Sequence, residues 1–393
     1  MDTTATADRV LDHIGAQRDP MLEFLRRLVE AESPSTSPVT HEPSRRVLTS
    51  ALTDLDYEVR VLNGDAGHAH VYARPAERTR HGGRQLLVGH YDTVWPVGTL
   101  AERCFEVDGN EVRGPGTLDM KGGLAQMVTA LRTLRDLALE PALTPLIFVN
   151  DDEEIGSRTS THHIRALSRI SDRALILEPA LGHRGRLKTA RKGIGRYTIS
   201  VHGKPAHAGL DPEKGSSAIL ELSIVIQKLF ALNDPVAGIS VNVGTIDGGI
   251  HANVIAPYSE AVVDVRVPDN SSGERIDEAI RAITPSMEGT RIVVEGGIGR
   301  PSMEPTPRNR ALWTLARGLG ADLGIDLEES SAGGASDGNT TSQYTATLDG
   351  LGSVGDGAHA EHEFLYIDKA LERSALLALL LLAPAGDEGG VAQ

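Results

Sequence analysis

Cysteine, long apolar runs and positive charge are all scarce in this sequence. The chain has one cysteine, Cys104, among 393 residues, so it cannot form an internal disulfide. This usage is consistent with a reducing compartment, and we expect a cytoplasmic protein. Residues 1–17 contain acids and no apolar core, so we expect no signal peptide.

The remaining two shortages exclude further classes of protein. Residues 375–383 are all Ala or Leu, but a transmembrane helix needs about 20 apolar residues, so we predict a buried helix there. Lys and Arg total 39 against 54 Asp and Glu, which gives a formal net charge of −15 and a pI near 5.4. We therefore expect neither nucleic acid nor an anionic membrane as a partner.

The length and the order of predicted elements indicate two domains. A chain of 393 residues exceeds what one hydrophobic core usually organises. Strand-like and helix-like segments alternate up to about Arg191, which predicts an α/β catalytic domain with a mostly parallel sheet and helices on both faces. We expect residues 1–193 and 301–393 to form it. Residues 331–341 are predicted to be a loop that contacts the active site.

Residues 194–300 are expected to be an inserted domain with the element order β-α-β-β-α-β. The predicted elements are strand 197–201, helix 216–232, strands 239–245 and 260–267, helix 272–283 and strand 291–295. This order is typical of a ferredoxin-like α+β layer. Its open edge strand and the apolar helix 219–232 suit dimerisation, so we expect a homodimer and a dimerisation or lid domain.

Potential metal ligands follow several apolar runs, at the points where glycine- or proline-marked turns begin. His90 and Asp92 end the run 86–94, and alternate residues of an extended chain point the same way, so the two side chains can meet. A ligating imidazole needs its other N–H held, usually by a carboxylate or a carbonyl, and Asp92 is placed to hold it. Asp119 lies in a glycine-rich loop before a helix-like stretch at 124–137, where it could bridge two cations.

Four successive acids, Asp151 to Glu154, end another apolar strand. They repel one another, which suggests that a cation neutralises them. Neighbouring residues cannot both face one metal, so Glu154 is the expected ligand and Glu153 the general base. Glu178 ends a third apolar strand, and His359 comes far along the chain, just before the closing helix.

Each of these residues also has an ordinary explanation. A His-x-Asp after a strand is often a packing feature, a Glu-Glu pair is often solvated, and an Asp before Lys-Gly-Gly is often a turn or helix cap. Their convergence at strand ends favours a site, because α/β folds place ligand sites there.

Five stretches of the chain resemble the zinc aminoacylase and carboxypeptidase family, which includes glutamate carboxypeptidase, acetylornithine deacetylase and succinyl-diaminopimelate desuccinylase. They are residues 89–94, 114–123, 152–157 and 178–179, and His359 with Glu363. The similarity spans nearly the whole chain, and glutamate carboxypeptidase is closest in pattern.

The resemblance implies two zinc ions per subunit, with Asp119 bridging them. His90 and Glu178 would complete one site, and Glu154 and His359 the other. Co²⁺ or Mn²⁺ would also suit such ligands.

The resemblance extends into the expected inserted domain. His207 matches the family histidine that reaches across a dimer and polarises the scissile carbonyl in the partner's active site, and Asn253 matches a second oxyanion contact. Arg266 and Arg300 are candidates for a bidentate bond to the free carboxylate of the substrate. Arg300 is preferred, because Arg266 lies in a strand-like run and could pair with an acid there.

Two features depart from the family pattern or compete with it. Met120 follows Asp119 where many relatives carry a second acid. His362 rivals His359 as a ligand, but only His359 keeps the His-x-x-x-Glu spacing to Glu363.

The sequence therefore predicts a zinc metallopeptidase of the carboxypeptidase type, acting on an amide bond beside a free carboxylate in a small molecule or short peptide. An N-acyl-amino-acid deacylase, such as a deacetylase or desuccinylase, is an alternative that would use the same residues. A non-catalytic metal-binding relative is another, but a structural metal site has no need of a base such as Glu153.

Overall fold

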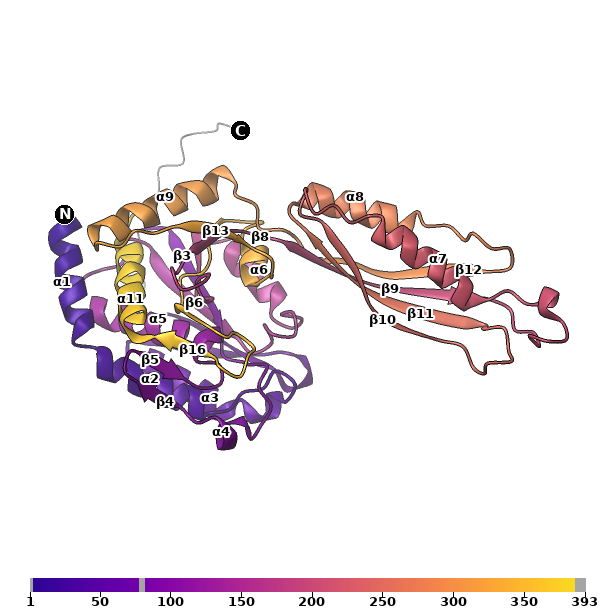
Figure 1. The fold of residues 1–393 in the computed structure, drawn as a ribbon. Helices are drawn as coiled ribbons and strands as arrows, with labels where there is room; N and C mark the ends of the chain where they lie inside the picture. Colours follow the sequence, from indigo (N-terminus) through magenta and orange to yellow (C-terminus); the bar gives the residue numbers. More distant parts are fainter. Residues whose placement is uncertain (1–2, 78–81, 386–393) are drawn as a thin grey trace. The chain divides into compact units, whose positions relative to one another are not determined.

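The computed structural model describes residues 3–77 and 82–385 (Figure 1). The chain divides into two compact units. The first comprises Met1–Thr189, Pro305–Ser331 and Ser336–Gln393, and the second comprises Ala190–Glu304 and Ala332–Ala335.

The first unit is built on a six-stranded sheet with the order β1-β2-β6-β3-β7-β14. Its strands are β1 (Tyr57–Asn63), β2 (Ala69–Pro75), β3 (Arg84–His90), β6 (Thr144–Asn150), β7 (Arg173–Ile176) and β14 (Ala346–Leu348). Strands β3, β6, β7 and β14 run parallel, and β1 and β2 are antiparallel at one edge. The prediction of a mostly parallel sheet is confirmed.

Alternate residues of the central strands point into two different cores. Leu87 and Ile147 pack with residues of α1, α2, α5 and α11, whereas their neighbours Leu86 and Phe148 pack with Ile164 of α6 on the other face. Extended backbone requires this alternation, and burial on both faces explains why the strands are apolar throughout.

The other elements of this unit cover the sheet or form small additions to it. The helices are α1 (Thr3–Gly15), α2 (Arg18–Glu30), α3 (Glu42–Thr53), α4 (Thr99–Glu102), α5 (Gly122–Asp136), α6 (Thr161–Ser168), α9 (Pro307–Asp322), α10 (Asp337–Thr341) and α11 (Ile367–Leu382), with one-turn helices η1 (Pro38–Thr40), η2 (Asp65–Gly67) and η3 (Thr117–Lys121). A small sheet contains β4 (Glu106–Asp108), β5 (Glu111–Arg113), β15 (Gly355–Asp356) and β16 (Phe364–Tyr366).

The apolar run near the end of the chain is a buried helix. Residues 375–381 of α11 are buried, and α11 packs along α5 (Figure 1). Among the residues that the structure describes, no helix has both the length and the apolar character needed to cross a bilayer.

The second unit is an antiparallel sheet with the order β10-β11-β9-β12, covered by two helices. Its elements are β9 (Gly193–His202), η4 (Pro212–Lys214), α7 (Ala218–Phe230), β10 (Ser240–Gly248), β11 (Tyr258–Val267), α8 (Asn270–Arg281) and β12 (Arg291–Arg300). The ferredoxin-like order β-α-β-β-α-β is confirmed. Strand β10 forms one edge of the sheet. Strands β8 (Leu187–Arg191) and β13 (Glu329–Ala332) pair with each other where the chain passes between the units.

Candidate metal centre

The expected ligands lie together at the carboxyl ends of the central strands of the six-stranded sheet. Strand β3 lies between β6 and β7 and runs parallel to both, so the carboxyl ends of the three strands coincide. His90 is the last residue of β3, Glu154 follows the end of β6, and Glu178 follows the end of β7.

The side chains form two groups that share Asp119. In the first group, His90 Nε2 lies 3.3 Å from Asp119 Oδ1 and 3.5 Å from Glu178 Oε1. In the second, His359 Nε2 lies 3.5 Å from Asp119 Oδ2 and 3.0 Å from Glu154 Oε2. The two oxygens of Asp119 therefore face different groups, as a carboxylate that bridges two cations must.

The atoms of the first group fit a metal better than they fit each other. His90 Nε2 and Asp119 Oδ1 are buried and have no hydrogen-bond partner, although buried polar atoms are normally paired. A divalent cation between them would satisfy both atoms. Imidazole and carboxylate ligands are typical of catalytic zinc sites.

The electrostatics of both groups agree with a demand for positive charge. Burial would raise the pKa of Asp119, but the nearby imidazoles of His359 and His90 lower it below its ordinary range. Hydrogen bonds to Asp119 and Glu154 raise the pKa of His359 to about 10. The carboxylates favour either protonated imidazoles or a bound metal cation beside them. Binding of a cation here would therefore release protons from the imidazoles.

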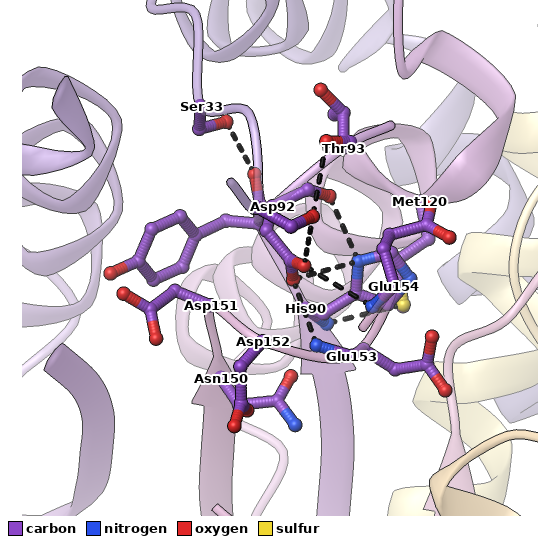
Figure 2. Close-up of polar contacts among 12 residues, drawn as sticks. Ser33, His90, Asp92, Thr93, Met120, Asn150, Asp151, Asp152, Glu153 and Glu154 are labelled. Atoms are coloured by element: carbon purple, nitrogen blue, oxygen red, sulfur yellow. Dashed lines mark hydrogen bonds and ion pairs between the residues drawn. The ribbon is translucent and has the colours of Figure 1, made fainter. Parts of the chain in front are cut away.

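Asp92 forms hydrogen bonds that connect the end of β3 with the segment after β6 (Figure 2). His90 Nδ1 lies 3.0 Å from the Asp92 carbonyl oxygen and 3.4 Å from Oδ1. The Asp92 carboxylate accepts hydrogen bonds from the backbone amides of Glu153 and Glu154, each at 3.2 Å, and from the Ser35 hydroxyl at 2.7 Å.

Both the backbone and the side chain of Asp92 lie against the imidazole of His90. The carbonyl oxygen is the nearer acceptor for Nδ1, and the carboxylate lies slightly farther from the same nitrogen. Donation from Nδ1 leaves the Nε2 lone pair free for a metal. The Asp92 carboxylate also positions Glu153 and Glu154 by accepting hydrogen bonds from their backbone amides. Glu154 belongs to the second ligand group and Glu153 to neither.

Protein donors surround Asp151, the first carboxylate of the acidic run after β6. This carboxylate accepts hydrogen bonds from His41 Nδ1 at 3.0 Å, His68 Nδ1 at 3.1 Å and the Ala69 amide at 2.9 Å. His70 Nδ1 lies 3.1 Å from it. Strand β2 is antiparallel to β6, so the start of β2 brings His68 and His70 beside the end of β6, whereas His41 comes from the turn before α3.

Asp152 is likewise occupied by protein donors. It accepts hydrogen bonds from the Thr159 amide at 2.6 Å, the Thr159 hydroxyl at 2.9 Å and the Ser160 hydroxyl at 2.5 Å. His70, Asp151 and Asp152 also bring potential ligand atoms close together, and both carboxylates accept hydrogen bonds from the protein.

His362, the rival to His359, belongs to neither ligand group. It lines a cavity of about 210 Å³ together with Gly114, Glu363 and the exposed Cys104. Its neighbour in the sequence motif, Glu363, is buried and contacts the loop that carries Asp119.

His207 and Asn253 lie close together in the second unit. The Ala208 amide donates to the Asn253 carbonyl at 3.0 Å. His207 Nδ1 accepts hydrogen bonds from the amides of Gly209 at 3.1 Å and Leu210 at 3.2 Å. An accepting Nδ1 places the ring proton of the neutral imidazole on Nε2, so this exposed side chain can act as a donor.

The two candidate arginines are also in the second unit. Arg266 makes a bidentate pair with Asp264, at 2.8 Å from Nε and 3.1 Å from a terminal nitrogen. Arg300 is the last residue of β12 and is half-buried.

Comparisons of the sequence with known proteins agree with the motifs. The peptidase dimerisation domain of the M20 type matches residues 189–288. Carboxypeptidase G2 of Pseudomonas sp. (strain RS-16) is 28% identical over 314 residues, which cover 78% of this chain and 75% of the relative. Acetylornithine deacetylase of Pectobacterium carotovorum subsp. carotovorum (strain PC1) is 26% identical over 335 residues, covering 78% and 84%.

Solved structures share the fold. The aminopeptidase PepT from Bacillus cereus ATCC 10987 matches with a TM-score of 0.75 and 21% identity, covering 93% of this chain and 98% of its own. The M20 family metallo-carboxypeptidase Sso-CP2 from Sulfolobus solfataricus matches with a TM-score of 0.69 and 16% identity, covering 92% and 98%. The resemblance inferred from the motifs is confirmed.

Proposed function

Because this chain is a relative of the M20 metallopeptidases, we propose that it is a di-zinc hydrolase that cleaves an amide bond beside a free carboxylate, like a glutamate carboxypeptidase. The observation that supports this most is the shared carboxylate of Asp119, whose two oxygens face His90 and His359.

Two sets of ligands follow from this geometry. His90, Asp119 and Glu178 would hold one zinc ion, and Asp119, Glu154 and His359 the other. When bound, the two cations would lower the pKa of a water molecule and polarise the scissile carbonyl.

The chain's own residues then move the protons. Glu153 takes the proton of the attacking water as the new C–O bond forms, and returns it to the leaving nitrogen as the C–N bond breaks. Asp92 holds the Glu153 amide at 3.2 Å and so positions this base. His207 Nε2 and the Asn253 side-chain amide donate hydrogen bonds to the oxygen that becomes negative.

We assign recognition of the substrate carboxylate to Arg300. Arg266 pairs with Asp264 through two hydrogen bonds, and Arg300 ends β12. A planar guanidinium matches a carboxylate with two parallel hydrogen bonds, which accounts for the requirement for a free carboxylate.

The dimerisation domain suggests a homodimer. Ile219 and Leu220 on α7 are 48% and 52% exposed, and Ile246 on the edge strand β10 is 62% exposed. Apolar side chains next to an open strand edge suit burial against a second copy. We place the dimer in the cytoplasm, where its one cysteine would stay reduced.

An N-acyl-amino-acid deacylase is the second candidate, favoured by the similarity to acetylornithine deacetylase. One substrate panel separates the two functions: folyl-glutamate, N-acetyl and N-succinyl amino acids, and dipeptides, assayed with metal-reconstituted protein. We expect the highest kcat/KM for a C-terminal glutamate. Preference for acetyl or succinyl substrates would favour the deacylase, and no hydrolysis at full metal occupancy would contradict both. Amidated substrates are the control for the free carboxylate.

A further inference from the structure

Glu363 is a buried acid that collects N–H groups from the loop carrying Asp119. Its Oε1 accepts hydrogen bonds from the backbone amides of Leu118 at 2.9 Å and Asp119 at 3.0 Å. Its Oε2 accepts from the Gly116 amide and from the indole nitrogen of Trp95, each at 2.8 Å. The residue is 4% exposed, so the protein supplies both oxygens with donors in place of water.

This loop needs an acceptor from elsewhere in the chain. Gly114 and Gly116 have φ values of +145° and +73°, and Asp119 interrupts the helical geometry of η3. The loop amides therefore point toward one spot instead of pairing along a regular element, and such converging N–H groups bind an anion. Buried N–H groups without an acceptor would be costly.

Glu363 also joins the two segments that meet at the proposed metals. The Glu363 amide donates to the Ala360 carbonyl at 3.0 Å, which closes the turn that begins beside His359. Glu363 therefore contacts the turn beside His359 through its backbone amide. Its carboxylate accepts a hydrogen bond from the backbone amide of Asp119.

We propose that Glu363 is a positioning residue that sets where the carboxylate of Asp119 reaches the two ligand groups. This inference rests on the proposed function, because it assumes that Asp119 binds metal. Loss of partners that orient metal ligands typically weakens metal binding by about 10- to 100-fold.

Glu363 lines the cavity of about 210 Å³, where Arg103, Arg113 and His362 are also found. This space allows a small carboxylate to reach the position that a truncated residue 363 would leave empty. Formate is the smallest such anion, and it can accept N–H hydrogen bonds as the Glu363 carboxylate does.

The test measures metal affinity by competition with a chromophoric chelator, in the wild type, Glu363→Gln, Glu363→Ala and the control Glu361→Gln. Glu361 lines the same cavity and is exposed. Glu363→Gln keeps the size of the side chain but turns one acceptor into a donor. We expect both Glu363 variants to bind zinc at least about 10-fold more weakly, and the control to stay within about twofold of the wild type, as expected of an exposed side chain.

Formate should restore most of the lost affinity in Glu363→Ala, whereas chloride at equal ionic strength should not. Unchanged affinity in Glu363→Gln would overturn the proposal, and so would a loss that formate leaves alone and that matches a loss in metal-free Tm. If Glu363→Ala does not fold, Glu363→Gln decides alone. Turnover is not used here, so a wild type that binds two metals without hydrolysing the panel would contradict only the proposed function.

Discussion

Glu153 and its neighbour Glu154 offer the sharpest comparison among single residues. Glu153 lies outside both ligand groups, so Glu153→Gln should keep the metals while turnover falls by at least about 100-fold. Metal analysis beside steady-state kinetics measures both quantities. Near-native turnover, or loss of metal in step with activity, would show that Glu153 has a different role.

The choice between His359 and His362 is tested by metal content. His359 Nε2 lies within 3.5 Å of two carboxylates, whereas His362 lines the neighbouring cavity. We expect His359→Ala to lose or weaken one of the two metals and His362→Ala to retain both. The opposite result would transfer the ligand role to His362.

Site residues that end or follow a strand could be predicted from the sequence, but their partners from distant segments could not. His90, Glu154 and Glu178 follow apolar runs, and that placement brings them together at the carboxyl ends of neighbouring parallel strands. Ser35 reaches Asp92 across 57 positions, and Trp95 reaches Glu363 across 268. Neither contact has a local spacing that would indicate it, because the packing of the folded chain creates it.

At the scale of elements, the antiparallel strand β2 changes the chemistry at the end of β6. The parallel order predicted from the sequence accounts for β3, β6 and β7, but it does not place the start of β2 beside Asp151. His41 faces an acceptor with each ring nitrogen, Asp151 at 3.0 Å and the Pro34 carbonyl at 2.8 Å. His41 therefore connects the Asp151 carboxylate to a segment that the parallel strand order does not include.

This cluster predicts a pH-dependent contribution to stability. Burial would raise the pKa of Asp151, but hydrogen bonds from His41, His70 and the Ala69 amide lower it below its ordinary value. A depressed folded-state pKa stabilises the protein above the unfolded value of about 3.9, and the contribution is lost as pH falls toward the lower folded-state value.

We therefore expect Asp151→Asn to lower the free energy of unfolding by about 3 kcal/mol at pH 7, as for a broken buried pair. The gap to the wild type should shrink as pH falls below about 4. Urea unfolding between pH 3 and 7 measures this, with Asp108→Asn on the exposed strand β4 as the control. A gap that is constant with pH would mean that charge does not cause it.

One element was missed although its signal was present in the sequence. Residues 331–341 were predicted to be a loop, but the structure forms α10 over Asp337–Thr341. The Ser336 hydroxyl accepts from the Gly338 amide, and the Asn339 side chain accepts from the Ser336 amide, each at 3.0 Å. This capping box is readable as Ser-x-x-Asn. Strand β12 also runs past its predicted end at residue 295, because Ile298 pairs with Gly195.

For the whole molecule, the central prediction is that His207 acts in the partner's active site. His207→Ala should bind metals normally but turn over roughly 100-fold more slowly, because an oxyanion donor contributes nothing to metal binding. Glu153→Gln should be inactive for a different reason. A hybrid dimer of these two variants contains one site with an intact Glu153 and an intact partner histidine.

Mixing the two inactive variants should therefore restore activity. At equal and random mixing half of the dimers are hybrids with one working site in two, so activity should approach about a quarter of wild type. Mass spectrometry of differently tagged subunits confirms exchange, and each variant mixed with itself is the control. Proven exchange without recovered activity would place His207 in its own site or outside the reaction.

The split first unit also sets the order in which the two ligand groups are synthesised. His90, Asp119 and Glu178 all precede residue 190, whereas His359 follows the complete second unit. Amino-terminal segments leave the ribosome first, so the nascent chain presents one full set of ligands while the other still lacks its imidazole. Under the proposed function, a centre of two metals could therefore be completed only after nearly the whole chain has been made.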